Sequence, residues 1–153
     1  MEREEDKRFF RYKPAEDHPG WYTWNIIDET RFNHAVMGPM LIRLEGDKCR
    51  VRMTPERKHS NLQDMIHGAV TLALIDISLF AGMRTLTDNE GARAVTLELS
   101  TQFIGAGRME EPLDSVVEVL RETGRMVFMR GQVEQAEHLV ASFSGLVRKA
   151  PRP

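Results

Sequence analysis

The pattern of apolar and polar positions separates one long apolar segment from several short, strand-like ones. Residues 68–83 read GAVTLALIDISLFAGM and are apolar on almost every helical face, which predicts a buried helix that continues to Leu86. Asp88, Asn89 and Gly91 are expected to end this helix. About twenty residues at a rise of ~1.5 Å give a helix of ~30 Å, the width of a small domain.

Shorter segments on both sides of this helix predict strands. Residues 40–45 and 48–53 flank the pair Gly46-Asp47, and a glycine in the first position of a two-residue loop suits a type II′ hairpin turn. Further strands are expected in residues 94–103, 113–121, 126–135 and 139–149. The connections between the later segments are short, which favours antiparallel pairing. The sequence therefore predicts an α+β layer of one long helix and about five antiparallel strands.

The predicted helix is apolar on more sides than one sheet can cover. In the strand that follows it, alternation places Val95, Leu97 and Leu99 on one face and Thr96 on the other. A sheet with one face in solvent cannot surround the helix alone. We therefore expect a partner subunit to cover part of the helix.

Length and composition agree with a single domain. The chain has 153 residues, of which 41% are hydrophobic, and this is enough to bury a core. The domain is expected over residues 21–149, after a polar, mobile or loosely docked arm of residues 1–20 and before a tail of residues 150–153. Asp28 or Thr30 is expected to cap a short helix near the start of the domain.

Charge and cysteine content narrow the function classes. The net charge of -2 excludes the general basic surface of a nucleic-acid-binding protein. A single cysteine, Cys49, excludes an intramolecular disulfide, and no Cys/His cluster has zinc-site spacing, so no metal or cofactor is expected. The charged first residues are unlike a secretory signal, and the apolar segment is shorter than the ~20 residues of a membrane span. A cytoplasmic protein without a membrane partner is expected.

Asp76 is the only charged residue between Gly68 and Met83. An ionised carboxylate in an apolar interior costs roughly several kcal/mol unless a partner compensates it. The residues three and four positions away are all apolar: Leu72, Ala73, Leu79 and Phe80. Asp76 must therefore face a cleft, a backbone donor or another chain, either as a base or nucleophile or as a structural aspartate.

The start of the predicted helix is a second candidate for chemistry. A helix amino end presents free N–H groups, and Gly68 allows a ligand carbonyl to approach the backbone. His67 is interpreted as a helix cap in preference to a proton-transfer group, and Asn61 either orders a turn or binds a ligand carbonyl. Because Asp76 lies ~12 Å from Gly68 along the helix, one carbonyl can contact both only across a two-fold dimer with antiparallel helices.

The spacing Asn61-x5-His67-Gly68-x7-Asp76, followed by a strand from Val95 to Phe103, resembles that of the PaaI-type hotdog-fold acyl-CoA thioesterases. The resemblance runs from about Gly38 to Lys149. It implies a hotdog fold, in which a curved antiparallel sheet wraps a long helix. It also implies homodimers, often paired into tetramers, that have acyl-CoA as substrate and active sites between subunits.

The resemblance also implies roles for residues. Asp76 corresponds to the general base or nucleophile, Gly68 to the amide that polarises the thioester carbonyl, and Asn61 to the group that positions the carbonyl or the water. Thr96 corresponds to a hydroxyl that orients the water. His67 and Ala69 flank the Gly68 amide and are counted with the substrate-binding residues. Contacts to the phosphates of coenzyme A are expected from Arg57, Lys58, His59 and Arg108.

Two glycines of the family pattern are replaced in this chain. Ala69 adds a methyl group that is expected to narrow the acyl pocket, and Asp64 is expected to adopt the left-handed conformation of the glycine it replaces. These replacements leave open a hotdog protein that binds acyl-CoA without hydrolysing it. A hotdog dehydratase is less favoured, because no histidine accompanies Asp76 on its helix. A purely structural dimerisation domain would give Asp76 no role.

Overall fold

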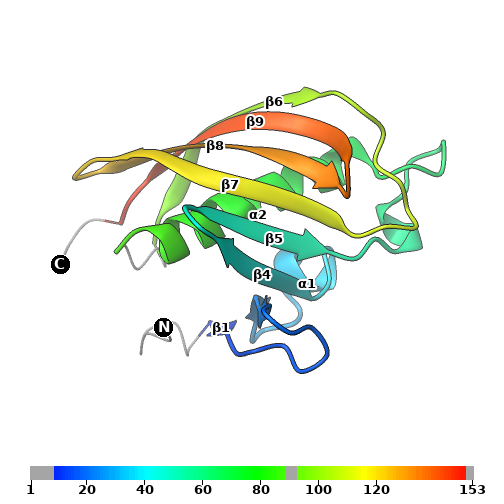
Figure 1. Ribbon diagram of the computed structural model, residues 1–153, viewed down its shortest axis with the longest axis horizontal. Helices are drawn as coiled ribbons and strands as arrows, with labels where there is room; N and C mark the ends of the chain where they lie inside the picture. Colours follow the sequence, from blue (N-terminus) through cyan, green and yellow to red (C-terminus); the bar gives the residue numbers. More distant parts are fainter. Residues whose placement is uncertain (1–8, 89–92, 151–153) are drawn as a thin grey trace.

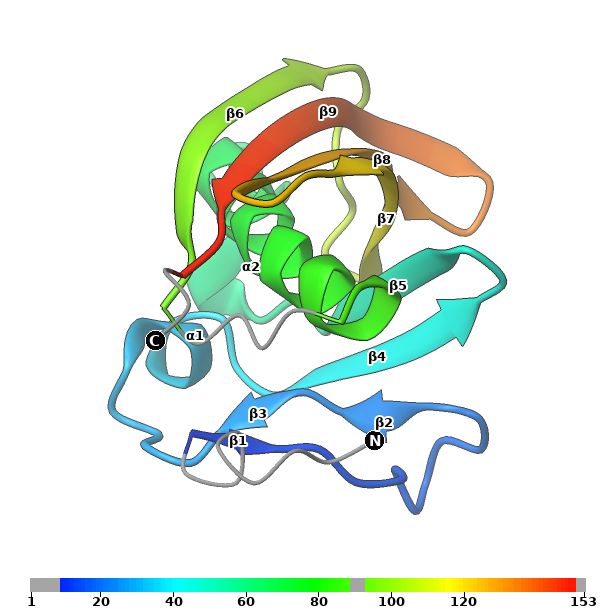
Figure 2. The ribbon, with the colours of Figure 1, turned by 90° about the vertical axis from the view of Figure 1, so that its left-hand side faces the viewer.

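In the computed structural model, which describes residues 9–88 and 93–150, an antiparallel sheet curves around one long helix (Figures 1 and 2). The helix, α2 (Gly68–Leu86), lies in the concave face of the sheet. This arrangement confirms the predicted α+β hotdog fold and the predicted helix. Parts of three predicted features lie outside the described residues: the beginning of the arm, the tail beyond Ala150, and the helix-ending Asn89 and Gly91.

The main sheet has seven strands in the order β2-β4-β5-β7-β8-β9-β6. Every neighbouring pair is antiparallel. The strands are β2 (Tyr22–Thr23), β4 (Met40–Glu45), β5 (Lys48–Met53), β6 (Val95–Phe103), β7 (Leu113–Glu122), β8 (Met126–Gln135) and β9 (His138–Arg148). The sheet has more strands than the predicted number of about five, because all six predicted segments form strands and the short β2 joins the edge. The hairpin β4–β5 has the predicted bounds, and Gly46 has the positive φ of +64° that the first residue of a type II′ turn needs.

Helix α2 packs very closely on the sheet at two glycines. A methyl group at Gly82 would lie 2.6 Å from Val117 of β7, and one at Gly145 of β9 would lie 2.5 Å from Leu79 of α2. Both distances are shorter than van der Waals contact, so the close approach requires glycine. By length and composition α2 could cross a membrane, but half of it is buried within this fold, as expected for a core helix.

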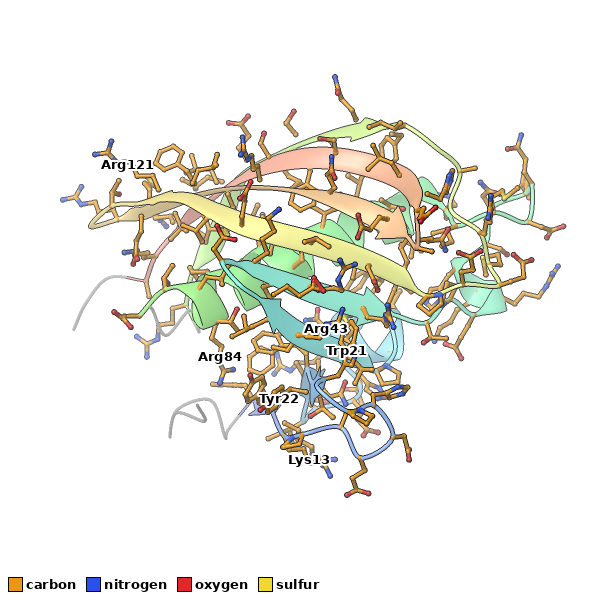
Figure 3. All side chains as sticks on the ribbon, in the orientation of Figure 1. Lys13, Trp21, Tyr22, Arg43, Arg84 and Arg121 are labelled. Carbon is orange, nitrogen blue, oxygen red and sulfur yellow. The ribbon has the colours of Figure 1, made fainter. Side chains whose placement is uncertain are left out.

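The amino-terminal segment is more ordered than the predicted loose arm. Residues Phe10–Arg11 form β1, which pairs with β3 (Asn25–Ile26), and the ring of Phe10 stacks on that of Trp24. Trp21 is buried, and the guanidinium groups of Arg43 and Arg52 each lie 4.4 Å from its ring centroid. Figure 3 shows Trp21 beside Arg43. The expectation of a loosely docked arm is therefore wrong for residues 9–20, because these aromatic contacts hold the segment on the domain.

The short helix α1 (Phe32–Ala35) begins later than predicted. Its N-cap position is Arg31, which makes no side-chain cap. The Asp28 carboxylate instead accepts hydrogen bonds from the backbone N–H and the hydroxyl of Thr30, so neither residue caps the helix. A 3-10 turn, η2 (Arg57–His59), precedes the loop that leads into α2.

Strand β6 is an edge strand, and it departs from the predicted alternation. A β-bulge between Thr96 and Glu98 changes which side chains face the helix. Thr96 therefore faces α2, whereas Val95 and Leu97 are exposed by 42% and 49%. The predicted alternation, which put Val95, Leu97 and Leu99 on one face, is therefore wrong across the bulge, because a bulge cannot be recognised from a period of two.

Candidate functional site at the amino end of α2

The loop before α2 is ordered by the side chain of Asn61. Its Oδ1 accepts hydrogen bonds from the backbone N–H groups of Gln63 and Met65, at 2.9 and 3.1 Å. Asp64 has a φ of +57°, which confirms that it takes the left-handed conformation predicted for it. Asn61 is thus a turn asparagine, as one of its two interpretations held.

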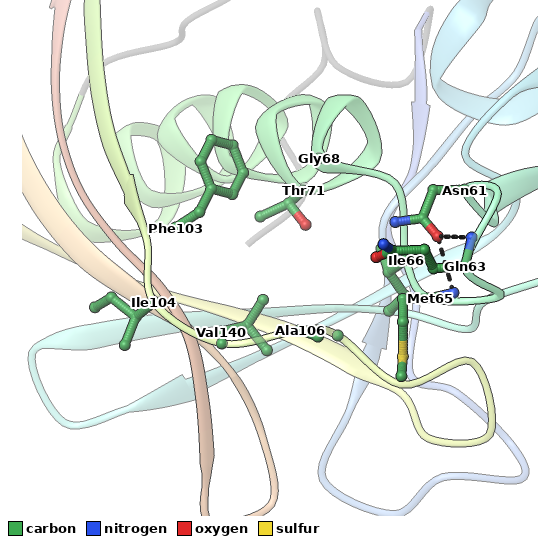
Figure 4. A pocket seen from close by; sticks show the side chains of 12 residues that line it. Asn61, Gln63, Met65, Ile66, Gly68, Thr71, Phe103, Ile104, Ala106 and Val140 are labelled. Carbon is green, nitrogen blue, oxygen red and sulfur yellow. Dashed lines mark hydrogen bonds between the residues drawn. The ribbon is translucent and has the colours of Figure 1, made fainter.

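The same bonds fix which way the Asn61 amide points. Because Oδ1 is held by two backbone donors, Nδ2 must face away from the loop. Figure 4 shows Nδ2 on the cavity side, and no group in the described part of the chain accepts a hydrogen bond from it. Asn61 therefore orders the loop and also offers a donor to a ligand.

His67 is the N-cap of α2, as expected. Its Nδ1 accepts from the N–H of Ala69 at 2.9 Å, and its carbonyl oxygen accepts from the N–H groups of Val70 and Thr71. Gly68 N–H is then the one amide of this first turn without an acceptor among the described residues. A helix amino end favours developing negative charge, so this amide is placed to bind an oxyanion.

A cavity of about 290 Å³ lies between the start of α2, the loop and the end of β6 (Figure 4). Twelve residues line it: Asn61, Gln63, Met65, Ile66, Gly68, Thr71, Phe103, Ile104, Gly105, Ala106, Gly107 and Val140. A methyl group at Gly68 would lie 3.5 Å from the ring of Phe103, an ordinary contact, and the φ of Gly68 is not positive. The fold of the chain therefore does not require glycine here, whereas the open space over its amide suits a carbonyl.

Asp76 is half-buried on α2 and has a partner within its own chain. The hydroxyl of Thr96 on β6 donates a hydrogen bond to Asp76 Oδ1 at 2.6 Å. This contact brings together two predicted site residues that are twenty positions apart, and it depends on the bulge in β6. Asp76 Oδ2 has no bonding partner in residues 9–88 and 93–150. Asp76 and Gly68 remain ~12 Å apart along one helix.

The predicted cationic contacts Arg57, Lys58 and Arg108 each have an acidic neighbour and differ in their exposure. Arg57 is 90% exposed beside a second hollow on the outer side of the loop, where Asp64 lies 3.7 Å away. Lys58 donates a hydrogen bond to the carbonyl oxygen of Ala35 and forms an ion pair with Glu56, and Arg108 forms an ion pair with Glu111. Arg57 is thus the most exposed of the three cations and has the longest ion pair, so it is the most accessible to a phosphate.

His59 and Cys49 have structural roles. His59 is 1% exposed, its Nδ1 accepts from the backbone N–H of Glu56, and its Nε2 lies 2.6 Å from the carbonyl oxygen of Val36. The expectation that His59 contacts a phosphate is therefore wrong. Cys49 is fully buried, and burial raises the pKa of its thiol to about 11, so it packs and does not react.

Of the twelve residues that line the cavity, sequence reasoning identified Asn61 and Gly68 and missed the others, among them Phe103 and Thr71. Phe103 was assigned only to a strand, although its ring lies over Gly68. Thr71 follows Gly68 by three positions and therefore lies on the same helical face, a signal that was available in the sequence. Ala69 is exposed and does not line the cavity, so its expected effect on the acyl pocket stays a prediction. In the described residues no three His, Cys, Asp or Glu side chains are placed to hold a metal ion.

The sequence and the fold have counterparts in known proteins. The model of the thioesterase superfamily matches residues 63–142. A Pseudomonas aeruginosa protein named "Putative esterase PA0474" is 28% identical over 112 residues, which are 72% of this chain and 83% of that protein. Zebrafish thioesterase superfamily member 2 has a similar structure, with a TM-score of 0.69 and 19% identity over 80% of this chain and 89% of that one. The E. coli PaaI protein, from the phenylacetic acid degradation operon, has a TM-score of 0.67 and 16% identity over 80% and 87% of the two chains.

Proposed function

Because the chain belongs to the thioesterase superfamily, we propose that it hydrolyses an acyl-CoA thioester to the free acid and coenzyme A. The observation that carries this proposal is the pair of unused donors at the start of α2, the Gly68 N–H and the Asn61 amide. Both belong to residues that line one cavity. Two fixed donors at a helix amino end suit the oxygen of a thioester carbonyl, which gains negative charge when a nucleophile attacks.

In this mechanism the Gly68 amide binds the carbonyl oxygen and Asn61 orients it. Donors of this type are already in place before reaction, so they stabilise the charged transition state without reorganising. The phosphate groups of coenzyme A stay outside the cavity, where the exposed side chain of Arg57 can bind one of them.

The carboxylate that completes the site comes from a second subunit. Residue 72 is the midpoint between Gly68 and Asp76, and Leu72 is 37% exposed on the uncovered side of α2. A two-fold axis near Leu72, with the two α2 helices antiparallel, brings Asp76 opposite Gly68 of the partner subunit. The exposed Val95 and Leu97 of β6 add apolar surface beside this face.

Asp76 then acts as the general base. Thr96 holds Oδ1, and Oδ2 accepts a proton from the attacking water. The water oxygen bonds to the carbonyl carbon, and the tetrahedral intermediate collapses with cleavage of the carbon–sulfur bond. The leaving thiolate takes the proton from Asp76. Direct attack by the carboxylate, through an anhydride that water hydrolyses, gives the same products.

The test is Asp76→Asn, assayed by thiol release from short, medium, long and aromatic acyl-CoAs. We expect kcat to fall by about 10²–10⁴-fold, because a general base typically contributes that much, while the fold and the oligomeric state stay unchanged. Asp47→Asn is the matched control, since Asp47 is exposed in the β4–β5 turn. Wild-type rates in Asp76→Asn would refute the assignment. Tight binding of acyl-CoA without thiol release from the wild type would favour the non-catalytic alternative.

A further inference from the structure

Thr71 differs from the other hydroxyl residues of α2. Ser78 and Thr85 donate hydrogen bonds to carbonyl oxygens three and four residues earlier, those of Ile75 and Ala81, both at 2.7 Å. This is the usual arrangement for a hydroxyl inside a helix. Thr71 is only 2% exposed, yet its hydroxyl has no hydrogen-bond partner among the described residues. Because Thr71 lines the cavity and its oxygen is not among the buried atoms of the described chain that lack a partner, this oxygen is open to the cavity and can bond to a ligand there.

The hydroxyl of Thr71 is placed to meet such a ligand. Thr71 lines the cavity, and Figure 4 shows its side chain directed from α2 toward the segment that contains Ile104 and Ala106. The other polar side chains of the cavity, those of Asn61 and Gln63, are more exposed and belong to the loop. Thr71 is therefore the polar side chain of the buried end, where the remaining walls are apolar.

Position along the helix decides which part of the substrate reaches Thr71. The charged nucleotide of coenzyme A must stay in solvent, so the buried end of the cavity takes the acyl group. Three residues of α-helix separate Thr71 from Gly68 by a rise of ~4.5 Å. An oxygen on the third carbon of an acyl chain lies a few bonds from the carbonyl oxygen, which matches this spacing.

We infer that Thr71 determines specificity for acyl groups that carry an oxygen near the thioester, such as 3-hydroxyacyl or 3-oxoacyl chains. This inference rests on the proposed function. A site that holds a buried hydrogen-bonding group discriminates strongly against an analogue that leaves the group unpaired. The chain should therefore prefer an oxygenated acyl group over the saturated chain of equal length.

The experiment compares butyryl-CoA with 3-hydroxybutyryl-CoA, assayed as both enantiomers, in the wild type and in Thr71→Val. Valine keeps the shape of threonine and removes the hydroxyl. We expect the wild type to have a higher kcat/KM for one 3-hydroxybutyryl-CoA enantiomer than for butyryl-CoA. Thr71→Val should lower this preference roughly tenfold, because kcat/KM falls for the hydroxy substrate and stays the same for butyryl-CoA. Thr71→Ser retains the hydroxyl and should retain the preference.

Thr101→Val is the matched control. Thr101 also has a hydroxyl without a partner, but its oxygen is buried away from the cavity, so its substitution should leave the substrate ratio unchanged. No preference in the wild type, or equal changes for both substrates in Thr71→Val, would overturn the inference. If the wild type releases no thiol, the proposed hydrolysis is wrong. The ratio of dissociation constants for the same two thioesters, measured by calorimetry, then decides the role of Thr71.

Discussion

At the residue scale, the first turn of α2 shows how a helix cap can select one backbone donor. His67 satisfies three N–H groups, with its ring nitrogen for Ala69 and with its carbonyl for the two residues that follow. Gly68 precedes these groups and keeps its N–H free of any acceptor in the described chain. The cap therefore stabilises the helix and at the same time isolates the amide that the proposed reaction uses.

Gly68→Pro removes this one N–H. Proline is well tolerated at the first position of a helix, and His67 before it already has the extended conformation, φ −63° and ψ 136°, that a residue before proline prefers. We expect kcat to fall by about 10²–10³-fold, the effect of losing one oxyanion donor. Gly68→Ala keeps the N–H and has room beside Phe103, so it should lose less. Equal losses in the two variants would show that bulk at this position matters and the donor does not.

Thr101 offers a test on stability. Its Oγ1 is buried without a hydrogen-bond partner, which costs about 1–3 kcal/mol in the folded state. Thr101→Val removes the unpaired oxygen and keeps a β-branched side chain in β6. We expect the melting temperature to rise by several degrees, roughly 1 kcal/mol of stabilisation, in thermal unfolding. Thr85→Val, which loses a hydroxyl bonded to Ala81, should give no such gain.

The site residues differ in how far the sequence could predict them. Asp76 could be found because a lone charge in an apolar helix needs an explanation. The family resemblance indicated Thr96 as a hydroxyl that orients the water, but its hydrogen bond to Asp76 was not predicted. The direction of the Asn61 amide could not be predicted from the sequence, because it depends on two backbone donors in the folded loop. The hydrogen bond from Lys58 Nζ to the carbonyl oxygen of Ala35 joins segments that are 23 residues apart, so no local sequence pattern predicts it.

At the element scale, the helix and the hairpin were predicted best because their signals are local. Gly68–Leu86 and both strands of the hairpin have the predicted bounds. Strand β6 was predicted as a strand, but its predicted regular alternation is interrupted, since a bulge shifts side chains without changing composition. The crossover that pairs β6 with β9 was also beyond local reasoning, because strand order is set by long-range contacts.

The outer face of β4, β5 and β7 carries a charged network that should make stability depend on pH. Glu45 bonds to Arg50 at 2.6 Å, and Arg50 also reaches Asp114 on β7. The hydrogen bond from Arg50 is the main cause that lowers the pKa of Glu45 from 4.5 to about 2. A pKa lowered by folding gives stability that is complete above the unfolded value and is lost as the pH falls toward 2.

The variant Glu45→Gln isolates this contribution. We expect it to be less stable than the wild type in urea at pH 6, and the difference to shrink from about pH 4.5 downward. Glu110→Gln is the control, because Glu110 is exposed and has no ion pair in the described part of the chain. A stability difference that stays constant from pH 6 to pH 3 would exclude the carboxylate as its source.

At the scale of the whole molecule, the proposed function requires the uncovered side of α2 for both assembly and activity. Leu72 lies at the centre of this side, and in a two-fold dimer each copy of Leu72 lies near the other. Leu72→Glu would place two negative charges together at the axis. We expect this variant to be monomeric in light scattering and inactive in thiol release, while Leu120→Glu, an exposed leucine on β7, should change neither.

If the site is shared between subunits, two inactive variants should restore activity when they form a mixed dimer. In a dimer of Asp76→Asn with Gly68→Pro, the first chain supplies an intact Gly68 and the second an intact Asp76, so one of the two sites is complete. Random mixing after joint refolding makes half of the dimers mixed, so we expect roughly a quarter of wild-type activity from two inactive parents. If each site were built from one chain, every chain in the mixture would lack one group and activity would stay at the level of the parents. Thiol release measured before and after subunit exchange therefore separates a site within one chain from a site across the two-fold axis, whatever the acyl group.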